Sequence, residues 1–126
     1  MVKNFTRTRT PALNWESVKN RILSGSYELD LVLVGDKFMS ELNKKYRRKS
    51  GPTNVLAFPL GRGVGQIFID LPFSRRESKK SGAPWSRHVL YLYIHGLLHL
   101  KGYDHKKKTE TNIMKKEESK WLEMLS

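Results

Sequence analysis

The sequence feature that most constrains this chain is the apolar stretch Trp85–Lys101, which is followed directly by Gly102. Its length and composition predict one long buried helix, which Gly102 ends by adopting a left-handed conformation. His95 and His99 are four residues apart, so they project from the same face of that helix. The turn after Gly102 can bring His105 beside them. Three imidazoles with a free fourth position are the ligands of a catalytic zinc ion, so the spacing predicts a zinc site.

The zinc site indicates hydrolysis, because zinc held by three neutral imidazoles lowers the pKa of its bound water to near neutrality. Residues 95–105 read H-x-x-x-H-x-x-G-x-x-H, which is also the ligand spacing of the metzincin proteases. Those proteases carry a glutamate after the first histidine, and its carboxylate takes the proton from the water. Gly96 occupies that position here and cannot act as a base. Peptide hydrolysis is therefore the weaker interpretation.

The length of 126 residues indicates a single domain, residues 1–126. Hydrophobic periodicity predicts strands at residues 2–8, 27–34, 54–58 and 66–70, and helices at residues 14–23, 37–46, 85–101 and after a capping Thr109. Asp36 is expected to cap the second helix, Pro59 and Pro72 to end the last two strands, and the glycine-rich residues 60–65 to form a mobile turn.

Residues 74–81 fit either a short exposed helix or a loop. The order of elements predicts an α+β fold, in which a small mixed sheet of about four strands has helices covering one face. The metal site is expected on the long central helix and the turn that follows it.

The charge balance indicates a polyanionic partner. Lys and Arg number 24 against 12 Asp and Glu, a net charge of +12, which is typical of nucleic-acid binding. The longest apolar run, residues 89–100, is too short to span a bilayer, the N-terminus lacks the pattern of a signal peptide, and there is no cysteine. We therefore expect a cytoplasmic protein without a membrane partner. Beside a hydrolytic metal, the basic residues 44–49 favour phosphodiester over peptide cleavage.

Two segments carry a family resemblance: residues 46–59, YRRKSGPTNVLAFP, and residues 95–105, HGLLHLKGYDH. Both closely resemble the bacterial YbeY family of zinc-dependent endoribonucleases, which are specific for single strands. The resemblance implies one Zn²⁺ per chain, bound by His95, His99 and His105. It implies that Arg47 lies beside the metal cleft and is needed for activity. No small-molecule cofactor beyond the metal is expected.

The same resemblance implies a place in ribosome biogenesis. Members of the family act in ribosomal RNA processing, notably at the 3′ end of the small-subunit RNA, and in ribosome quality control. The expected partners are therefore single-stranded RNA, ribosomal RNA and ribosomal subunits. Two alternatives stay open: an RNA-binding ribosome-assembly factor with a structural zinc, and a metalloprotease without the usual glutamate.

Further side chains are assigned around this site. Asp104 is expected either to accept a hydrogen bond from a ligand imidazole or only to stabilise the tight turn. Contacts to RNA are predicted for Arg48, Lys49, Lys101 and Lys106. His88 lies two helical turns before His95 and is interpreted as structural or facing the RNA.

The sequence departs from the family pattern at three positions. Gln66 replaces the usual aspartate, Arg48 a common glycine and Ala57 a common serine. The exchange at Gln66 puts any role of that carboxylate in question. None of the departures affects the three histidines or Arg47, so we expect the metal site to be intact.

Overall fold

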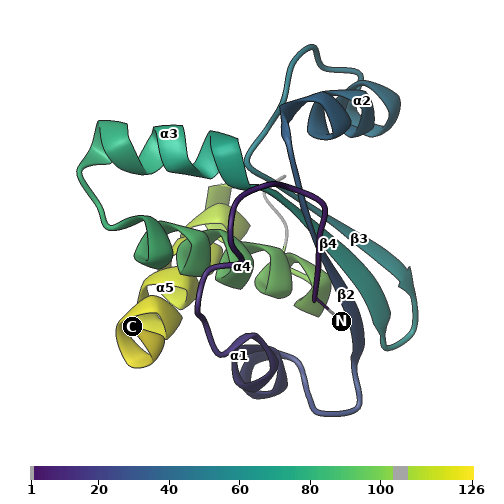
Figure 1. The fold of residues 1–126 in the computed structure, drawn as a ribbon. Coiled ribbons are helices and arrows are strands. Elements are labelled where there is room, and N and C mark those ends of the chain that lie inside the picture. Colours follow the sequence, from purple (N-terminus) through teal and green to yellow (C-terminus); the bar gives the residue numbers. More distant parts are fainter. Residues whose placement is uncertain (1, 104–107) are drawn as a thin grey trace.

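The computed structural model describes residues 2–103 and 108–126, and it shows a four-stranded mixed sheet with helices packed on both faces (Figure 1). The elements in chain order are β1 (Val2–Asn4), α1 (Trp15–Ile22), β2 (Glu28–Val34), α2 (Asp36–Arg47), β3 (Val55–Gly61), β4 (Val64–Asp70), α3 (Leu71–Ser81), α4 (Trp85–Lys101) and α5 (Lys108–Leu125). The strand order is β1-β2-β4-β3, with β3 antiparallel to β4 and the other pairs parallel. The predicted α+β class with about four strands is confirmed.

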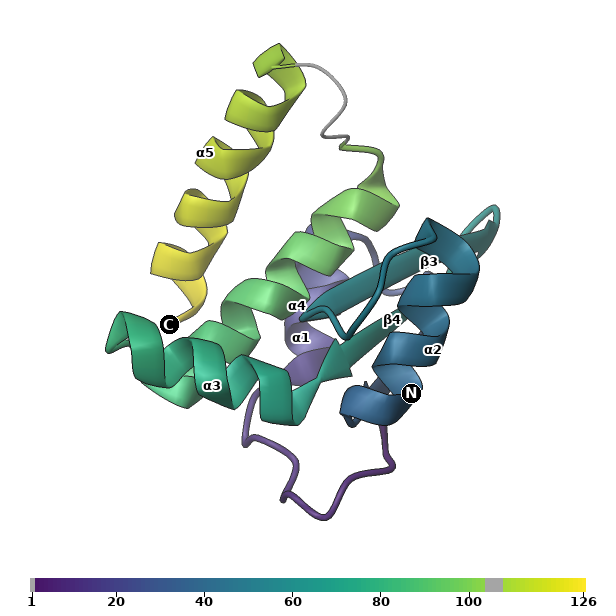
Figure 2. The ribbon, with the colours of Figure 1, turned by 90° about the horizontal axis from the view of Figure 1, so that it is seen from above.

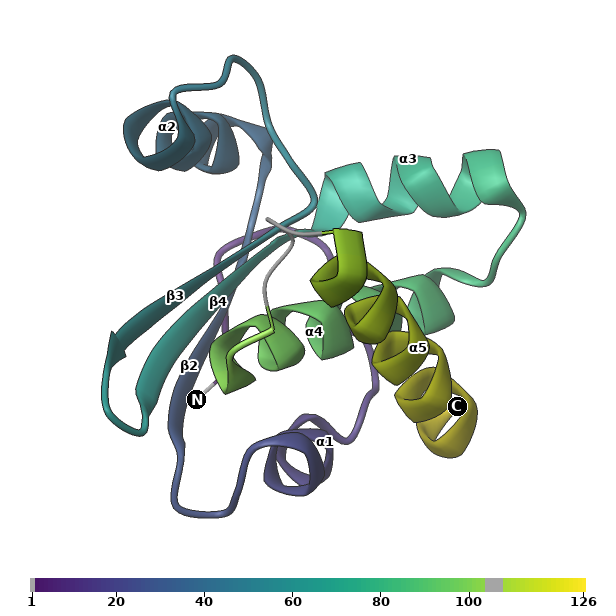
Figure 3. The ribbon, with the colours of Figure 1, turned by 180° about the vertical axis from the view of Figure 1, so that it is seen from behind.

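The central strands have apolar residues on both faces, and this corrects the expectation of helices on one face only. Leu31 and Leu33 of β2 pack in the main core with α1 and α4. Val32 and Val34 point the other way, into a second cluster that contains Met39 of α2. Since successive side chains of a strand alternate between faces, a run without polar residues must be covered on both sides. Accordingly, α2 lies across the sheet from α1 and α4 (Figures 1 and 3).

The hairpin formed by β3 and β4 differs from the sequence prediction at its proline and glycines. Pro59 lies within β3 instead of ending it, and the pairing shifts register between Pro59 and Gly61. Proline is tolerated there because β3 is an edge strand of the described sheet. The expected mobile turn is a tight connection in which Gly63 has a φ of 73°, a value that favours glycine.

Two predicted helix caps are wrong. Asp36 is the first residue of α2 and not its cap, and its carboxylate instead accepts two hydrogen bonds from Arg76 of α3, each of 3.0 Å. Thr109 lies inside α5, which begins one residue earlier. An aspartate in a first helical turn is still favourable electrostatically, but a distant arginine decides where its side chain points.

The segment after β4 forms a complete helix, α3, where the sequence allowed a helix or a loop. Pro72 follows the end of β4 and lies in the first turn of α3, a position where its missing N–H costs nothing. The side chain of Asp70 caps this helix by accepting a 3.0 Å hydrogen bond from the Phe73 N–H. Asp70 is completely buried.

The long helix α4 has the predicted bounds and lies between α5 and the sheet (Figures 2 and 3). Gly102 ends it in the left-handed conformation, with a φ of 119°. Gly96 lies against the sheet: a Cβ there would be 3.0 to 3.3 Å from three side-chain atoms of Ile67 in β4. The glycine therefore permits close helix–sheet packing, and any larger residue there would have to displace the Ile67 side chain. Within the described chain, no helix is long and apolar enough to cross a membrane.

Candidate active site

A cleft of about 480 Å³ opens between the end of α2, the start of β3 and the middle of α4. Its lining comes from three separate stretches of the chain: Tyr46 and Arg47, residues 53–58, and His95, Gly96 and His99. The two family-like segments of the sequence thus meet at one site. The cleft places a guanidinium and two imidazoles around the same space.

The structure gives a partial picture of the predicted metal ligands. His95 and His99 lie one turn apart on α4, and both line the cleft. His105, the third predicted ligand, lies outside the described residues, as do Asp104 and Lys106. Within residues 2–103 and 108–126, no three histidine, cysteine or acidic side chains converge as a metal site. The complete ligand set therefore stays a prediction.

Glu118 of α5 is a site residue that the sequence reasoning missed. Its carboxylate is almost fully buried, and Oε1 lies 3.3 Å from Nδ1 of His95. A carboxylate at Nδ1 favours the tautomer in which Nδ1 carries the proton and Nε2 carries the lone pair that a metal requires. Glu118 follows buried Met114 by one helical turn, so a charged residue on the apolar face of α5 was the available signal.

Tyr91 supports the same carboxylate from α4. Burial, followed by a hydrogen bond to Glu118, raises the pKa of Tyr91 to about 12. Its hydroxyl therefore stays protonated over the physiological range and can donate to Glu118. The Tyr91 and His95 rings are neighbours, with centroids 6.5 Å apart. The contact between α4 and α5 thus contains a polar group of three side chains centred on Glu118.

Arg47 is the last residue of α2, and it is the predicted catalytic residue that lines the cleft. Arg48 follows in the left-handed conformation, with a φ of 54°, and its backbone N–H caps the helix. This conformation is one that glycine adopts most easily at the end of a helix, which fits the glycine that the family resemblance implies at this position. Arg48, Lys49 and Lys101, all within the described chain, are exposed but do not line the cleft.

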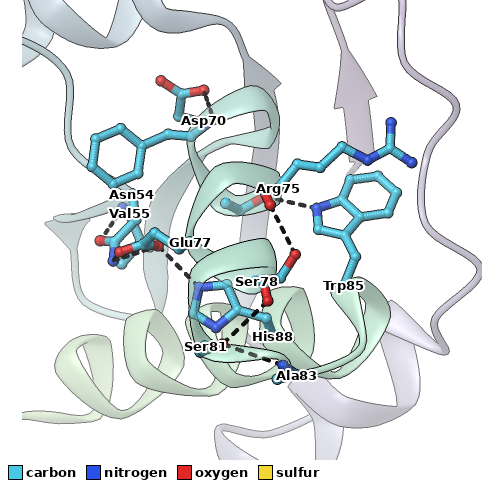
Figure 4. A network of polar contacts seen from close by, with 12 residues as sticks. Asn54, Val55, Asp70, Arg75, Glu77, Ser78, Ser81, Ala83, Trp85 and His88 are labelled. Carbon is cyan, nitrogen blue, oxygen red and sulfur yellow. Dashed lines mark hydrogen bonds and ion pairs between the residues drawn. The ribbon is translucent and has the colours of Figure 1, made fainter.

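The cleft wall at the start of β3 is held by polar contacts to α3 and α4 (Figure 4). The side-chain amide of Asn54 donates to both carboxylate oxygens of Glu77, at 3.2 Å each. Nε2 of His88 lies 2.9 Å from the same carboxylate. The backbone carbonyl of Asn54 also accepts from the Asp70 N–H at 2.9 Å. His88 therefore has a structural contact that helps fix the wall of the cleft.

The remaining departures from the family pattern fall on different sides of the sheet. Ala57 lines the cleft, where serine is common in the family. Gln66 pairs with Phe58, one position before Ile67 on β4. Because side chains alternate along a strand and Ile67 faces α4, Gln66 projects toward the face that α2 covers. The exchange at Gln66 is therefore on the other face of β4 from the helix that carries the histidines.

These features define a class: a small α+β protein whose basic cleft combines an arginine with two histidines on adjacent turns of a buried helix. The family model described as endoribonuclease YbeY matches residues 2–126. The chain therefore belongs to the YbeY family, and the resemblance seen in its sequence is confirmed.

Individual relatives support this assignment. The endoribonuclease YbeY of Ehrlichia canis is 36% identical over an aligned length of 129 positions, and the match covers 98% of this chain and 79% of the relative. That of Carboxydothermus hydrogenoformans is 37% identical over 102 residues, covering 77% and 71% respectively. The solution structure of TM1509 from Thermotoga maritima matches with a TM-score of 0.68 and 25% identity, covering 99% of this chain and 89% of that one. The family therefore rests on the sequence matches, and the solved structure shows that the same fold occurs in a second protein.

Proposed function

We propose that this protein is a zinc-dependent endoribonuclease that hydrolyses phosphodiester bonds of single-stranded RNA. The observation that carries the proposal is the convergence of Arg47, His95 and His99 in one cleft. Membership of the YbeY family and the net charge of +12 support RNA as the substrate. The protein would act in the cytoplasm, in maturation of the small-subunit ribosomal RNA 3′ end and in ribosome quality control, with ribosomal subunits as partners.

Two imidazoles of the described chain would serve as ligands of the proposed zinc ion. His95 and His99 supply imidazoles on adjacent turns, and Glu118 favours the tautomer of His95 that binds metals through Nε2. His105 is the proposed third ligand. When bound, zinc would supply a Lewis acid for the phosphoryl oxygen and would activate water at neutral pH.

Arg47 has a separate role in this proposal. A guanidinium can donate two parallel hydrogen bonds to a phosphate, which fixes its orientation relative to the imidazoles. It would also stabilise the negative charge on the nonbridging phosphoryl oxygens as the new bond forms. Arg47 would thus position the scissile phosphate, whereas the histidines would hold the metal. Position 96 supplies no carboxylate, and a side chain there would press against Ile67.

An RNA cleavage assay tests the function and the role of Arg47. With zinc present, the wild-type protein is expected to cut single-stranded RNA, and a chelator is expected to stop it. Arg47→Ala is expected to lower kcat/KM about 100- to 1000-fold, the usual effect of losing one donor to a developing oxyanion. Arg48→Ala removes the same charge outside the cleft, and we expect it to change kcat/KM only a few-fold.

The outcomes separate the alternatives. Equal losses in Arg47→Ala and Arg48→Ala would show that Arg47 contributes only general positive charge. Tight RNA binding without cleavage at any zinc concentration would favour an assembly factor with a structural metal. Cleavage of casein but not of RNA would favour the protease alternative.

A second prediction concerns Glu118. The variant Glu118→Gln is expected to bind zinc about 10- to 100-fold more weakly, because the neutral amide can turn its NH2 toward His95 and no longer raises the basicity of that imidazole as a carboxylate does. Glu117→Gln is the matched control, since Glu117 is the preceding residue and pairs instead with Lys120 at 3.4 Å. Zinc affinity is measured by competition with a chelating dye, and circular dichroism of the metal-free proteins checks the fold. Equal zinc affinities in the two variants would show that Glu118 has only a structural role.

A further inference from the structure

An exposed aromatic ring stands at the edge of the cleft. Tyr46 is in the last turn of α2, immediately before Arg47, and both residues line the cleft. Tyr46 nevertheless has 55% of its surface exposed, although large aromatic side chains normally bury most of their area. The ring therefore offers apolar surface to whatever occupies the cleft.

The Tyr46 ring packs at one end of a row of aromatic side chains. The Tyr46 centroid lies 5.0 Å from that of Phe58 on β3, and Phe58 lies 5.8 Å from Phe68 on β4. Phe68 is buried and stacks on Phe38 of α2, with centroids 6.0 Å apart. Contacts of this geometry hold each ring in place. Tyr46 is thus the end of a packed row that lines the cleft, whereas Phe38, the other exposed end, does not. The packing of Tyr46 means that little further ordering is required when a ligand binds.

The surrounding charge selects the ligand. The Nζ of Lys45 lies 5.2 Å from the centroid of the Tyr46 ring, and Arg47, Arg48 and Lys49 follow it as exposed cations. An exposed aromatic ring among cations is the combination that binds single-stranded nucleic acid, in which bases stack on the ring and phosphates meet the charges. A duplex does not offer a free base face, because its bases are stacked on one another.

We propose that Tyr46 is a stacking platform for an unpaired RNA base next to the phosphate that Arg47 holds. The inference rests on the proposed function and deepens it, because it assigns the preference for single strands to a particular side chain. The base stacks on the ring, and the cations that flank Tyr46 neutralise the backbone. A paired base cannot reach the ring without leaving its helix.

The test measures binding without turnover. Fluorescence anisotropy is recorded on the full chain in chelator, with three labelled RNA probes of equal length: a single strand, a duplex and an abasic strand. Tyr46→Ala is expected to weaken binding of the single strand about 5- to 100-fold, the usual effect of losing one base–aromatic stack. Tyr46→Phe keeps the ring and is expected to bind within about three-fold of wild type. Binding of the abasic strand is expected to be the same in all variants.

A matched control uses a second exposed ring. Phe5, with 74% of its surface exposed, follows β1 and does not line the cleft, so Phe5→Ala is expected to leave RNA binding unchanged. The platform would be overturned if Phe5→Ala and Tyr46→Ala lost the same affinity for the single strand. It would also be overturned if Tyr46→Ala lost as much affinity for the abasic strand as for the intact single strand. A large loss of single-strand binding in Tyr46→Phe would overturn it as well.

The platform and the proposed function fail in different ways. If the wild-type protein cleaves RNA with zinc while Tyr46→Ala binds the single strand normally, the platform is wrong and the function stands. If the wild-type protein neither binds nor cleaves single-stranded RNA, the proposed function is wrong. Thermal melting of each variant confirms that a loss of binding is not a loss of fold.

Discussion

The double variant His95→Ala/His99→Ala is expected to bind no zinc and to lose RNA cleavage by a factor of at least about 1000. Both imidazoles line the cleft on adjacent turns of α4, so their removal takes away two of the three proposed ligands at once. A single histidine binds zinc far too weakly to retain it through purification. Metal analysis of the purified proteins is expected to show about one zinc per wild-type chain and none in the variant.

The control for this variant is His88→Gln. His88 lies on the same helix but contacts Glu77, so the metal content is expected to match that of the wild-type protein. Urea unfolding of both metal-free variants shows whether α4 keeps its packing. A double variant that retains a full equivalent of zinc would place the metal elsewhere in the protein. Wild-type protein that takes up no zinc at all would contradict the proposed metal dependence.

The second large effect is a dependence of stability on pH that comes from Asp70. Burial, and then the hydrogen bond with Asp36, raise the pKa of Asp70 to about 7. Two carboxyl groups can share a hydrogen bond only when one of them is protonated. Asp36, in contrast, has its pKa lowered, first by its hydrogen bonds from Arg76. Asp70 is therefore the member of the pair that holds the proton.

The sign follows from the direction of the shift. The folded protein binds the Asp70 proton more tightly than the unfolded chain does, so its contribution to stability is fully present below about pH 4. It is lost as the pH rises to about 7. A shift of roughly three pKa units corresponds to about 4 kcal/mol in the free energy of unfolding. The depressed pKa of Asp36 has the opposite sign, and it acts only in the acid range.

Asp70→Asn isolates this contribution. An asparagine side chain can still accept from the Phe73 N–H and cap α3, but it cannot ionise. The variant is therefore expected to unfold at a higher urea concentration than the wild type at pH 8, and the difference is expected to shrink or reverse at pH 5. Asp36→Asn is the control, because it removes the exposed partner and the ion pair with Arg76. Parallel pH profiles for the wild type and Asp70→Asn would show that folding does not raise the pKa of Asp70.

Local sequence signals predicted most of the elements but not how they are combined. The bounds of α4 follow from an unbroken apolar stretch with a glycine after it, and both signals act within a few residues. The ion pair of Asp36 and the capping role of Asp70 could not be predicted in this way. Asp36 binds Arg76, which is 40 residues away, and Asp70 is the residue that caps a helix. Local preference is weaker than a bidentate ion pair that the packing brings into reach.

The family and the position of two histidines on one helix face follow from short segments of the sequence, because a helical repeat is a local property. What those histidines face depends on how distant segments pack together. The parallel pairing of β2 with β4 and the hairpin of β3 bring Arg47 and Tyr46 to the same cleft, and the packing of α5 on α4 puts the carboxylate of Glu118 beside His95. Such contacts join residues that are distant along the chain. The burial of apolar surface brings them together, and because this force is not directional, the local sequence does not show which segments will meet.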